Sequence, residues 1–385
     1  MATQRLPRIA FLPGEGVGPE VVAQARRVLY ALRGPGFDFE ALDAPPNAVG
    51  ALATDAWGEP LPPATLALAQ SADAVLFGSV GDPRHDHLPV HLRPERAILG
   101  LRRGLGLYAS LRHIAITGPL EALSPLKAER VRGVDLLVVR ELDGDAYTGQ
   151  PKGQRPVPDG PFAGQAEGFD TMRYAEGEVR RVAHVAFRAA ASRRALVTSV
   201  DKANVLESSR LWRRVVTEVS RDYPQVTLRH LYADNAAMAL IAQPRDFDVL
   251  LAGNLFGDIL SDAASVLTGS IGLPAAALLG DAQAQRCQGL FEAGHGTALD
   301  IAGRDQANPV ACIRAAALLL RHALQRPDLA QRVEHAVDAA LAAGWRTADI
   351  AQLGTPPALR VGTRGMSAVD LARHLLGEFG SLGRL

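Results

Sequence analysis

The segment ALVTSVDKAN (residues 195–204) contains a short apolar run that ends in an aspartate, a lysine and an asparagine. A short apolar run bounded by polar residues is typical of a buried β-strand. Similar runs recur at residues 8–12, 73–78, 134–139, 248–252 and 288–291. Segments with apolar residues at helical spacing separate them, notably residues 174–193, 207–219 and 309–324. Short buried strands that alternate with helices predict an α/β fold.

The composition is that of a globular protein with a large core. Of the 385 residues, 48% are hydrophobic and 21% are charged, which suits one large α/β unit or two lobes. The 41 acidic and 41 basic residues give a formal net charge of zero. Nucleic acids and anionic membranes attract proteins with a basic excess, so we expect neither as a partner.

The sequence gives no indication of export or of a membrane anchor. The first residues lack the apolar core of a signal peptide, and no run of about 20 uncharged apolar residues offers a membrane span. The two cysteines, Cys287 and Cys312, form no CxxC pair and no disulfide framework. We therefore expect a cytoplasmic protein.

Two glycine-rich segments interrupt the alternation of strands and helices. GEGVG (residues 14–18) follows a predicted strand and precedes a predicted helix, which suggests dinucleotide binding, although the Rossmann spacing is GxGxxG. A tight turn between strand and helix explains the glycines equally well. Residues 148–168 are rich in Gly, Pro, Gln and Asp and predict a loop or an extended arm.

Several charged residues could bind a small dicarboxylic acid and a cation. Arg102, Arg112 and Arg140 could each hold a carboxylate bidentately, although their spacing alone favours ordinary surface arginines. Asp258 and Asp262 lie four residues apart in a predicted helix, so both carboxylates project from one face. Such a pair suits Mg²⁺ or Mn²⁺, and a helix cap beside a solvated acid is the alternative.

Two further residues could take part in the same site, one as a cation ligand and one as a general base. Asp234 could complete a cation site, although periodicity does not bring it there. Lys202 follows the predicted strand of residues 196–200, and the ends of strands in α/β folds favour ligand groups. Beside a cation or arginines, its ammonium would be disfavoured, which makes a general base possible. A solvated surface lysine is the alternative.

Three long segments resemble the β-decarboxylating dehydrogenases, the family of isocitrate and 3-isopropylmalate dehydrogenases. They are TSVDKANVL (residues 198–206), NLFGDILSD (254–262) and HGTALDIAGRDQANP (295–309). The resemblance runs nearly end to end and implies a two-lobed, non-Rossmann α/β fold. It implies a cofactor-binding lobe of residues 1–107 and 275–385, and a lobe of residues 108–274 that binds substrate and metal and forms the dimer.

The resemblance also implies the catalytic residues and the metal ligands. Lys202 would take the proton of the substrate C2 hydroxyl, directly or through water, and Tyr147 would donate the proton that completes the product ketone. Mg²⁺ or Mn²⁺ would bind Asp234 of one chain and Asp258 and Asp262 of the other. The active unit would then be a homodimer with shared sites.

Substrate and cofactor contacts follow from the same resemblance. Arg102, Arg112 and Arg140 would hold the two malate carboxylates, and Ile98 and Leu99 would receive the C3 substituent. NAD would be bound by Glu95, Asn204, His295, Gly296, Asp300 and Asn308. NAD is expected rather than NADP because Asp300 would accept hydrogen bonds from the ribose and repel a 2′-phosphate.

The apolar pair Ile98 and Leu99 favours 3-isopropylmalate, with 4-methyl-2-oxopentanoate as product in leucine biosynthesis. One methylene is worth only about 1–3 kcal/mol of discrimination. Another 3-alkylmalate, D-malate, tartrate or homoisocitrate therefore stays open as a substrate. A catalytically silent regulatory subunit is the alternative of a different class, but such a subunit should have lost the matched arginines, lysine, tyrosine or acids, and all of these are present.

Some positions depart from the family pattern. Glu15 replaces aspartate, Leu299 replaces proline, and Ala293-Gly294 replaces Pro-Val, while residues 269–274 are one residue shorter than usual. The segment LDGDAYTG (residues 142–149) replaces LTGGIYFG and brings two acids beside Tyr147. These departures gather around substrate and cofactor, which suggests a paralogue with a shifted substrate.

Overall fold

The computed structural model describes residues 5–116, 118–281, 288–352 and 355–366. The chain forms two compact units. Unit 1 comprises Met1–Leu107, Leu111–Val134 and Ser265–Leu385, and unit 2 comprises Tyr108–Ser110 and Asp135–Ala264. The described residues before 108 and after 264 thus belong to unit 1, together with residues 111–134.

Unit 1 contains a mainly parallel sheet with the strand order β2-β1-β3-β12-β11. Its strands are β1 (Arg8–Gly14), β2 (Glu40–Asp43), β3 (Ala74–Ser79), β11 (Ala275–Gly280) and β12 (Gly289–Ala293). Strand β1 pairs in parallel with β2 and β3, β3 in parallel with β12, and β12 antiparallel with β11. The strand β4 (Leu107–Ala115) contributes residues to both units.

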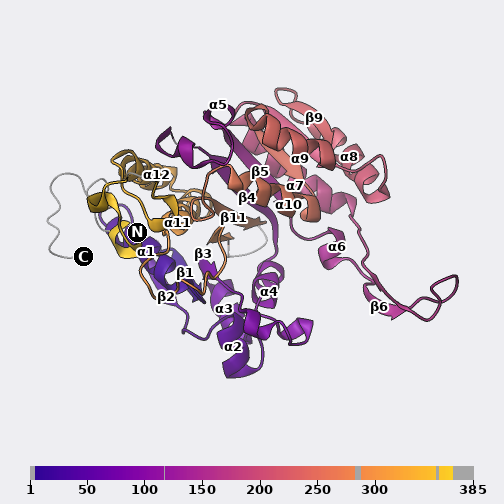
Figure 1. Cartoon of the computed structure of the whole chain (residues 1–385), viewed down its shortest axis with the longest axis horizontal. Coiled ribbons are helices and arrows are strands. Elements are labelled where there is room, and N and C mark those ends of the chain that lie inside the picture. Colours follow the sequence, from indigo (N-terminus) through magenta and orange to yellow (C-terminus); the bar gives the residue numbers. More distant parts are fainter. Residues whose placement is uncertain (1–4, 117, 282–287, 353–354, 367–385) are drawn as a thin grey trace. The chain divides into compact units, whose positions relative to one another are not determined.

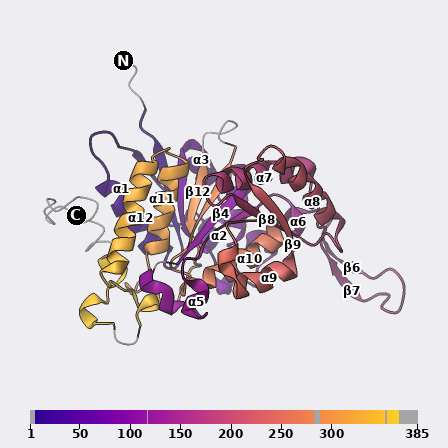
Figure 2. The ribbon, with the colours of Figure 1, turned by 90° about the horizontal axis from the view of Figure 1, so that it is seen from above.

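Helices bury the sheet of unit 1. Helix α1 packs on β1 and β3, α11 packs on β11, β12 and β3, and α12 packs on α11 (Figure 2). The long helices are α1 (Gly18–Ala31), α2 (Gly50–Trp57), α3 (Pro63–Ser71), α4 (Arg96–Gly104), α11 (Val310–His322) and α12 (Pro327–Ala342). Short helical turns complete the unit: η1 (Pro83–His85), η2 (Val90–Leu92), η3 (Gly118–Leu123), α5 (Ala128–Val131), η5 (Ala348–Ile350), η6 (Pro357–Leu359) and α13 (Thr363–Met366).

Unit 2 contains a parallel sheet with the strand order β5-β10-β8-β9. Its strands are β5 (Asp135–Glu141), β8 (Leu196–Asp201), β9 (Thr227–Tyr232) and β10 (Val249–Ala252). Its helices are α6 (Asp145–Thr148), α7 (Glu176–Ala191), α8 (Glu207–Ser220), α9 (Ala233–Ala242), η4 (Pro244–Asp246) and α10 (Asn254–Val266). Trp212 of α8 is fully buried against β8, where its Nε1 donates to Ser199 Oγ at 3.1 Å.

The predicted α/β fold is confirmed in its alternation of strands and helices. The run at residues 195–200 forms most of β8, and the helical segments 207–219 and 309–324 form α8 and α11. The expected arm is also present as an antiparallel hairpin of β6 (Gly153–Pro156) and β7 (Ala166–Phe169), which extends away from the rest of unit 2 (Figure 1). Among the described helices, none is long and apolar enough to cross a membrane.

The glycines of GEGVG allow two backbone segments to approach this turn closely. Gly14 and Gly16 have positive φ angles of 69° and 60°. A Cβ atom on Gly16 would lie 2.0 Å from the carbonyl oxygen of Thr297, whose oxygen accepts a hydrogen bond from Val17 N at 2.8 Å. The tight-turn interpretation therefore explains these glycines without a bound nucleotide.

We predict that Gly16→Ala lowers the free energy of unfolding by roughly 2–4 kcal/mol, because it combines left-handed strain with a steric clash. Gly34→Ala is the matched control in the same unit, since its Cβ would meet no atom within 4 Å. Urea titration followed by circular dichroism measures both. Equal stability of the two variants would contradict this account of the turn.

Candidate active site at the carboxyl ends of the unit 2 strands

The parallel sheet of unit 2 places several of the predicted site residues at one edge. Arg140 lies near the end of β5, Lys202 directly follows β8, and Asp234 is the second residue after β9, in α9. Asp258 and Asp262 lie in α10, which begins two residues after β10. Because parallel strands run in the same direction, their carboxyl ends and the segments after them share one edge of the sheet.

The carboxylate of Asp258 is the centre of this candidate site. Its Oδ1 accepts a hydrogen bond from Arg140 Nη1, and its Oδ2 accepts one from the hydroxyl of Tyr147. The guanidinium of Arg140 also lies 5.2 Å from the centroid of the Tyr147 ring. Three of the predicted site residues, from three separate segments, are thus in direct contact.

The surroundings of Tyr147 keep its hydroxyl protonated. Burial raises the pKa of Tyr147, and the hydrogen bond to the Asp258 carboxylate raises this pKa further. Proton donation requires a group that still holds its proton at neutral pH. The Tyr147 hydroxyl therefore holds its proton at neutral pH and donates it to the hydrogen bond with Asp258.

Arg140 is fixed by a residue to which the sequence analysis assigned no role. Its side chain is buried, and its Nε and Nη2 donate to Asn254 Oδ1 at 3.0 and 2.7 Å. The amide nitrogen of Asn254 donates in turn to the carbonyl oxygens of Leu142 and Gly144 at 3.0 and 3.3 Å. The only signal in the sequence was the position of Asn254, the polar residue between a buried strand and a helix.

Glu141 is a second residue that the sequence analysis missed. Its carboxyl group is fully buried and accepts hydrogen bonds from the backbone N–H groups of Asp143 and Gly144 at 2.8 and 2.7 Å. Burial raises the pKa of Glu141 to about 7, against the opposing effect of these two donors. Glu141 directly follows Arg140 in the sequence. Its carboxyl group fixes the backbone at residues 143 and 144, where the segment that carries Tyr147 begins.

Lys202 and Asp234 form a separate ion pair. Lys202 Nζ lies 2.8 Å from Asp234 Oδ1, and the lysine is half-buried whereas the aspartate is exposed. Hydrogen bonding to the Lys202 ammonium lowers the pKa of Asp234. The Asp234 carboxylate thus fixes the position of Lys202 Nζ at the carboxyl end of β8.

The three predicted metal ligands are not gathered within one chain. Among the described residues, no group of three His, Cys, Asp or Glu side chains is placed to hold a metal ion. Asp258 and Asp262 lie one turn apart on α10, and Asp262 is exposed. Their carboxylate oxygens fit the preference of Mg²⁺ and Mn²⁺ for hard ligands. A single chain thus offers two carboxylates on α10 and a third on α9.

Three of the four predicted substrate residues in unit 1 lie in helix α4. Ile98 and Leu99 are half-buried in α4, and Arg102 follows them by one turn, with its Nη2 3.8 Å from Glu292 Oε1. Arg112 of β4 lies with its Nη1 3.5 Å from Ser265 Oγ. Helix α4 thus presents an apolar pair and a cation together.

The predicted cofactor residues of unit 1 differ in their surroundings. Glu95, Gly296 and Asp300 are exposed. Burial lowers the pKa of His295, which favours its neutral ring. Asn308 is buried, and it bonds Asp349 Oδ2 through Nδ2 at 3.0 Å and Val310 N through Oδ1 at 3.0 Å. The remaining predicted residue, Asn204, is exposed in unit 2.

Comparison with known proteins places the chain. Residues 8–367 match the family model described as isocitrate/isopropylmalate dehydrogenase. The chain belongs to this family. A 3-isopropylmalate dehydrogenase of Bordetella avium (strain 197N) is 56% identical over 349 residues, which are 90% of this chain and 94% of that protein. A 3-isopropylmalate dehydrogenase of Burkholderia pseudomallei (strain 1710b) is 56% identical over 95% of this chain and 99% of its own.

Solved structures of the isocitrate/isopropylmalate dehydrogenase family share the fold. The isocitrate dehydrogenase of Methylococcus capsulatus is 30% identical, with a TM-score of 0.80 over 97% of this chain and 100% of that chain. The apo form of a β-decarboxylating dehydrogenase of Thermococcus kodakarensis is 32% identical, with a TM-score of 0.71 over 97% of this chain and 96% of that chain. The two-lobed, non-Rossmann fold class expected from the sequence is the one that these relatives have.

We predict that Glu141→Gln changes how stability depends on pH. The unfolded carboxyl group titrates near pH 4.5 and the folded one near 7, so the folded state binds the proton more tightly and the contribution of Glu141 falls as pH rises through this window. The difference in unfolding free energy, wild type minus variant, should therefore decrease from pH 4.5 to 7 and then stay level. Urea titrations at pH 5, 6, 7 and 8 measure it, and a difference independent of pH would refute the raised pKa.

Proposed function

We propose that this chain catalyses the NAD-dependent oxidative decarboxylation of (2R,3S)-3-isopropylmalate to 4-methyl-2-oxopentanoate, the dehydrogenase step of leucine biosynthesis. The contact of the Asp258 carboxylate with both Arg140 and the Tyr147 hydroxyl carries this proposal. A cation for a substrate carboxylate, a proton donor and a metal ligand meet there. Relatives named 3-isopropylmalate dehydrogenase, 56% identical, support the choice of substrate.

The residues of the chain divide the work of binding and proton transfer. Arg140, with Arg102 and Arg112, binds the two carboxylates and orients C2. Lys202 Nζ accepts the proton of the C2 hydroxyl, and the Tyr147 hydroxyl gives a proton to C3 after CO₂ has left. When bound, NAD would supply a hydride acceptor, and Mg²⁺ or Mn²⁺, which Asp234, Asp258 and Asp262 would hold, would supply Lewis acidity.

NAD is the proposed cofactor, bound by Glu95, Asn204, His295, Gly296, Asp300 and Asn308. The exposed carboxylate of Asp300 supports NAD over NADP, because it would repel a 2′-phosphate. The neutral ring of His295 avoids a buried charge beside the cofactor. Asn308 would act through the loop that it fixes, since its amide already bonds Asp349 and the first turn of α11.

A homodimer with shared sites is part of the proposal. On α9, Asp234 is followed at helical spacing by Met238 and Ile241, which are 61% and 56% exposed. On α10, Ile259 is 60% exposed and precedes the exposed Asp262 by three residues. Large exposed apolar residues beside expected metal ligands favour a partner surface. Pairing these faces would bring Asp234 of one chain to Asp258 and Asp262 of the other.

The lobes carry distinct roles in this proposal. Residues 1–107 and 275–385 form the cofactor-binding lobe, and residues 108–274 form the lobe that binds substrate and metal and makes the dimer. The location of Lys202, Asp234, Asp258 and Tyr147 in unit 2 supports the second assignment. The proposed compartment is the cytoplasm.

The substrate is tested by NADH formation with Mg²⁺ or Mn²⁺ against 3-isopropylmalate, 3-methylmalate, D-malate, tartrate, isocitrate and homoisocitrate. We expect a clear preference for 3-isopropylmalate, and Lys202→Met should lower kcat by about 10²–10⁴-fold because it removes the general base. Sedimentation of the variant should be unchanged. Preference for another acid would replace the proposed substrate, and inactivity on all of them would favour a noncatalytic subunit.

Mixing two inactive variants tests whether the sites are shared. We predict that Lys202→Met and Asp262→Asn, dissociated and reassociated together, recover about one quarter of wild-type activity, because half of the dimers are mixed and each has one intact site. Each variant treated alone is the control. If every site lay within one chain, both chains of a mixed dimer would be defective and the mixture would stay inactive.

A further inference from the structure

Asp145 has a backbone conformation that side chains rarely adopt. Its φ angle is +73°, in the left-handed region that favours glycine, and the residue is buried to 1% exposure. A buried aspartate in this conformation persists only where its surroundings compensate the strain. Hydrogen bonds to the Asp145 carboxylate compensate this backbone strain.

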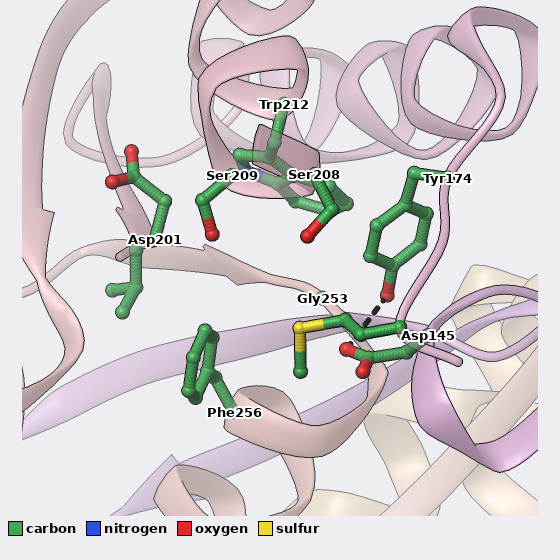
Figure 3. A pocket seen from close by; sticks show the side chains of 10 residues that line it. Asp145, Tyr174, Asp201, Ser208, Ser209, Trp212, Gly253 and Phe256 are labelled. Carbon is green, nitrogen blue, oxygen red and sulfur yellow. Dashed lines mark hydrogen bonds between the residues drawn. The ribbon is translucent and has the colours of Figure 1, made fainter. Parts of the chain in front are cut away.

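The Asp145 carboxylate binds the first turn of α10. Its Oδ2 accepts hydrogen bonds from Leu255 N at 3.2 Å and from the Tyr174 hydroxyl at 3.2 Å (Figure 3), and its Oδ1 accepts one from Ala146 N at 2.7 Å. The Tyr174 oxygen accepts in turn from Asn254 N at 2.7 Å. The first two N–H groups of α10, which lack partners within the helix, are thus satisfied by these two side chains.

The surroundings leave this arrangement little freedom. A Cβ on Gly144 or Gly253 would lie 2.2 or 2.8 Å from atoms of Tyr174, so the ring is closely packed on both sides. The cavity beside Asp145 and Tyr174 has a volume of about 10 Å³, at the lower limit for one water molecule. Figure 3 shows the two side chains facing each other across its edge.

Both segments joined by Asp145 carry groups of the proposed active site. Tyr147 follows Asp145 by two residues in α6, and Asp258 follows Asn254 by one turn in α10. Asn254 itself holds Arg140. We propose that Asp145 is a positioning residue, which places the Tyr147 hydroxyl against Asp258 by fastening α6 to the first turn of α10. The inference rests on the proposed function of Tyr147.

A glycine at position 145 would relieve the backbone strain, but it would remove the hydrogen bonds that join α6 to the first turn of α10. Leu255 N and the Tyr174 hydroxyl would both lose their acceptor, and α6 would gain freedom relative to α10. The proton from Tyr147 would then reach C3 less often and with less control of its direction. The expected defect lies in turnover and stereochemistry rather than in substrate affinity.

The test uses the full-length enzyme with 3-isopropylmalate, NAD and Mg²⁺ in D₂O. After CO₂ leaves C3, the C3–H bond that forms takes its hydrogen from the Tyr147 hydroxyl, which carries deuterium, so the wild-type product should be a single C3 monodeuterated stereoisomer. We predict that Asp145→Gly lowers kcat at least tenfold, changes KM less than threefold, and yields a mixture of stereoisomers. NMR of the reduced, derivatised product measures the ratio.

Two further variants keep the test decisive. Asp143→Asn, in the same segment, removes the ion pair with Arg181 and should retain wild-type kcat and stereochemistry. Asp145→Asn keeps one acceptor oxygen, so its kcat and stereochemical purity should lie between those of wild type and Asp145→Gly. This variant replaces Asp145→Gly in the test if the glycine variant fails to fold. Wild-type inactivity on 3-isopropylmalate would overturn the proposed function. An active wild type with unchanged kcat and stereochemistry in the Asp145 variants would overturn the positioning role alone.

Discussion

The arrangement of the candidate site depends on one carboxylate shared by two donors. Asp258 accepts from a buried arginine and from a tyrosine hydroxyl, and each donor comes from a different segment. Charge-assisted hydrogen bonds are stronger than neutral ones, and the loss of one partner leaves the other group unsatisfied. Asn254 accepts a hydrogen bond from Arg140 and donates one from its backbone N–H, in the first turn of α10, to Tyr174. These bonds keep Arg140 in place before any ligand binds.

Features that depend on short sequence patterns could be predicted from the sequence. Apolar runs between helical segments indicated the α/β fold, and the position of Lys202 after such a run indicated its place at the sheet edge, because strand ends can be recognised locally. The four-residue spacing of Asp258 and Asp262 predicted one helix face. The family resemblance supplied what spacing could not, namely that Arg140, Tyr147 and Asp258 belong to one candidate site.

Interactions between distant segments could not be predicted from the sequence. Glu141, Asn254 and Tyr174 look like ordinary polar residues until the fold brings their backbone partners to them. The acids of LDGDAYTG were expected to alter the surroundings of the substrate. In the structure, Asp143 pairs with Arg181 and Asp145 binds the start of α10. Both therefore have structural partners within unit 2, and these two departures do not require a different substrate.

The pairing of β3 with β12 has a consequence for biosynthesis. It joins residues near 75 to residues near 290, about 200 residues later, so the sheet of unit 1 stays incomplete during most of translation. The strands of unit 2 all precede residue 253 and emerge from the ribosome earlier. Unit 2 can therefore begin to fold while the first strands of unit 1 await their partner, and a nascent chain released early would expose the apolar edge of β3 to aggregation.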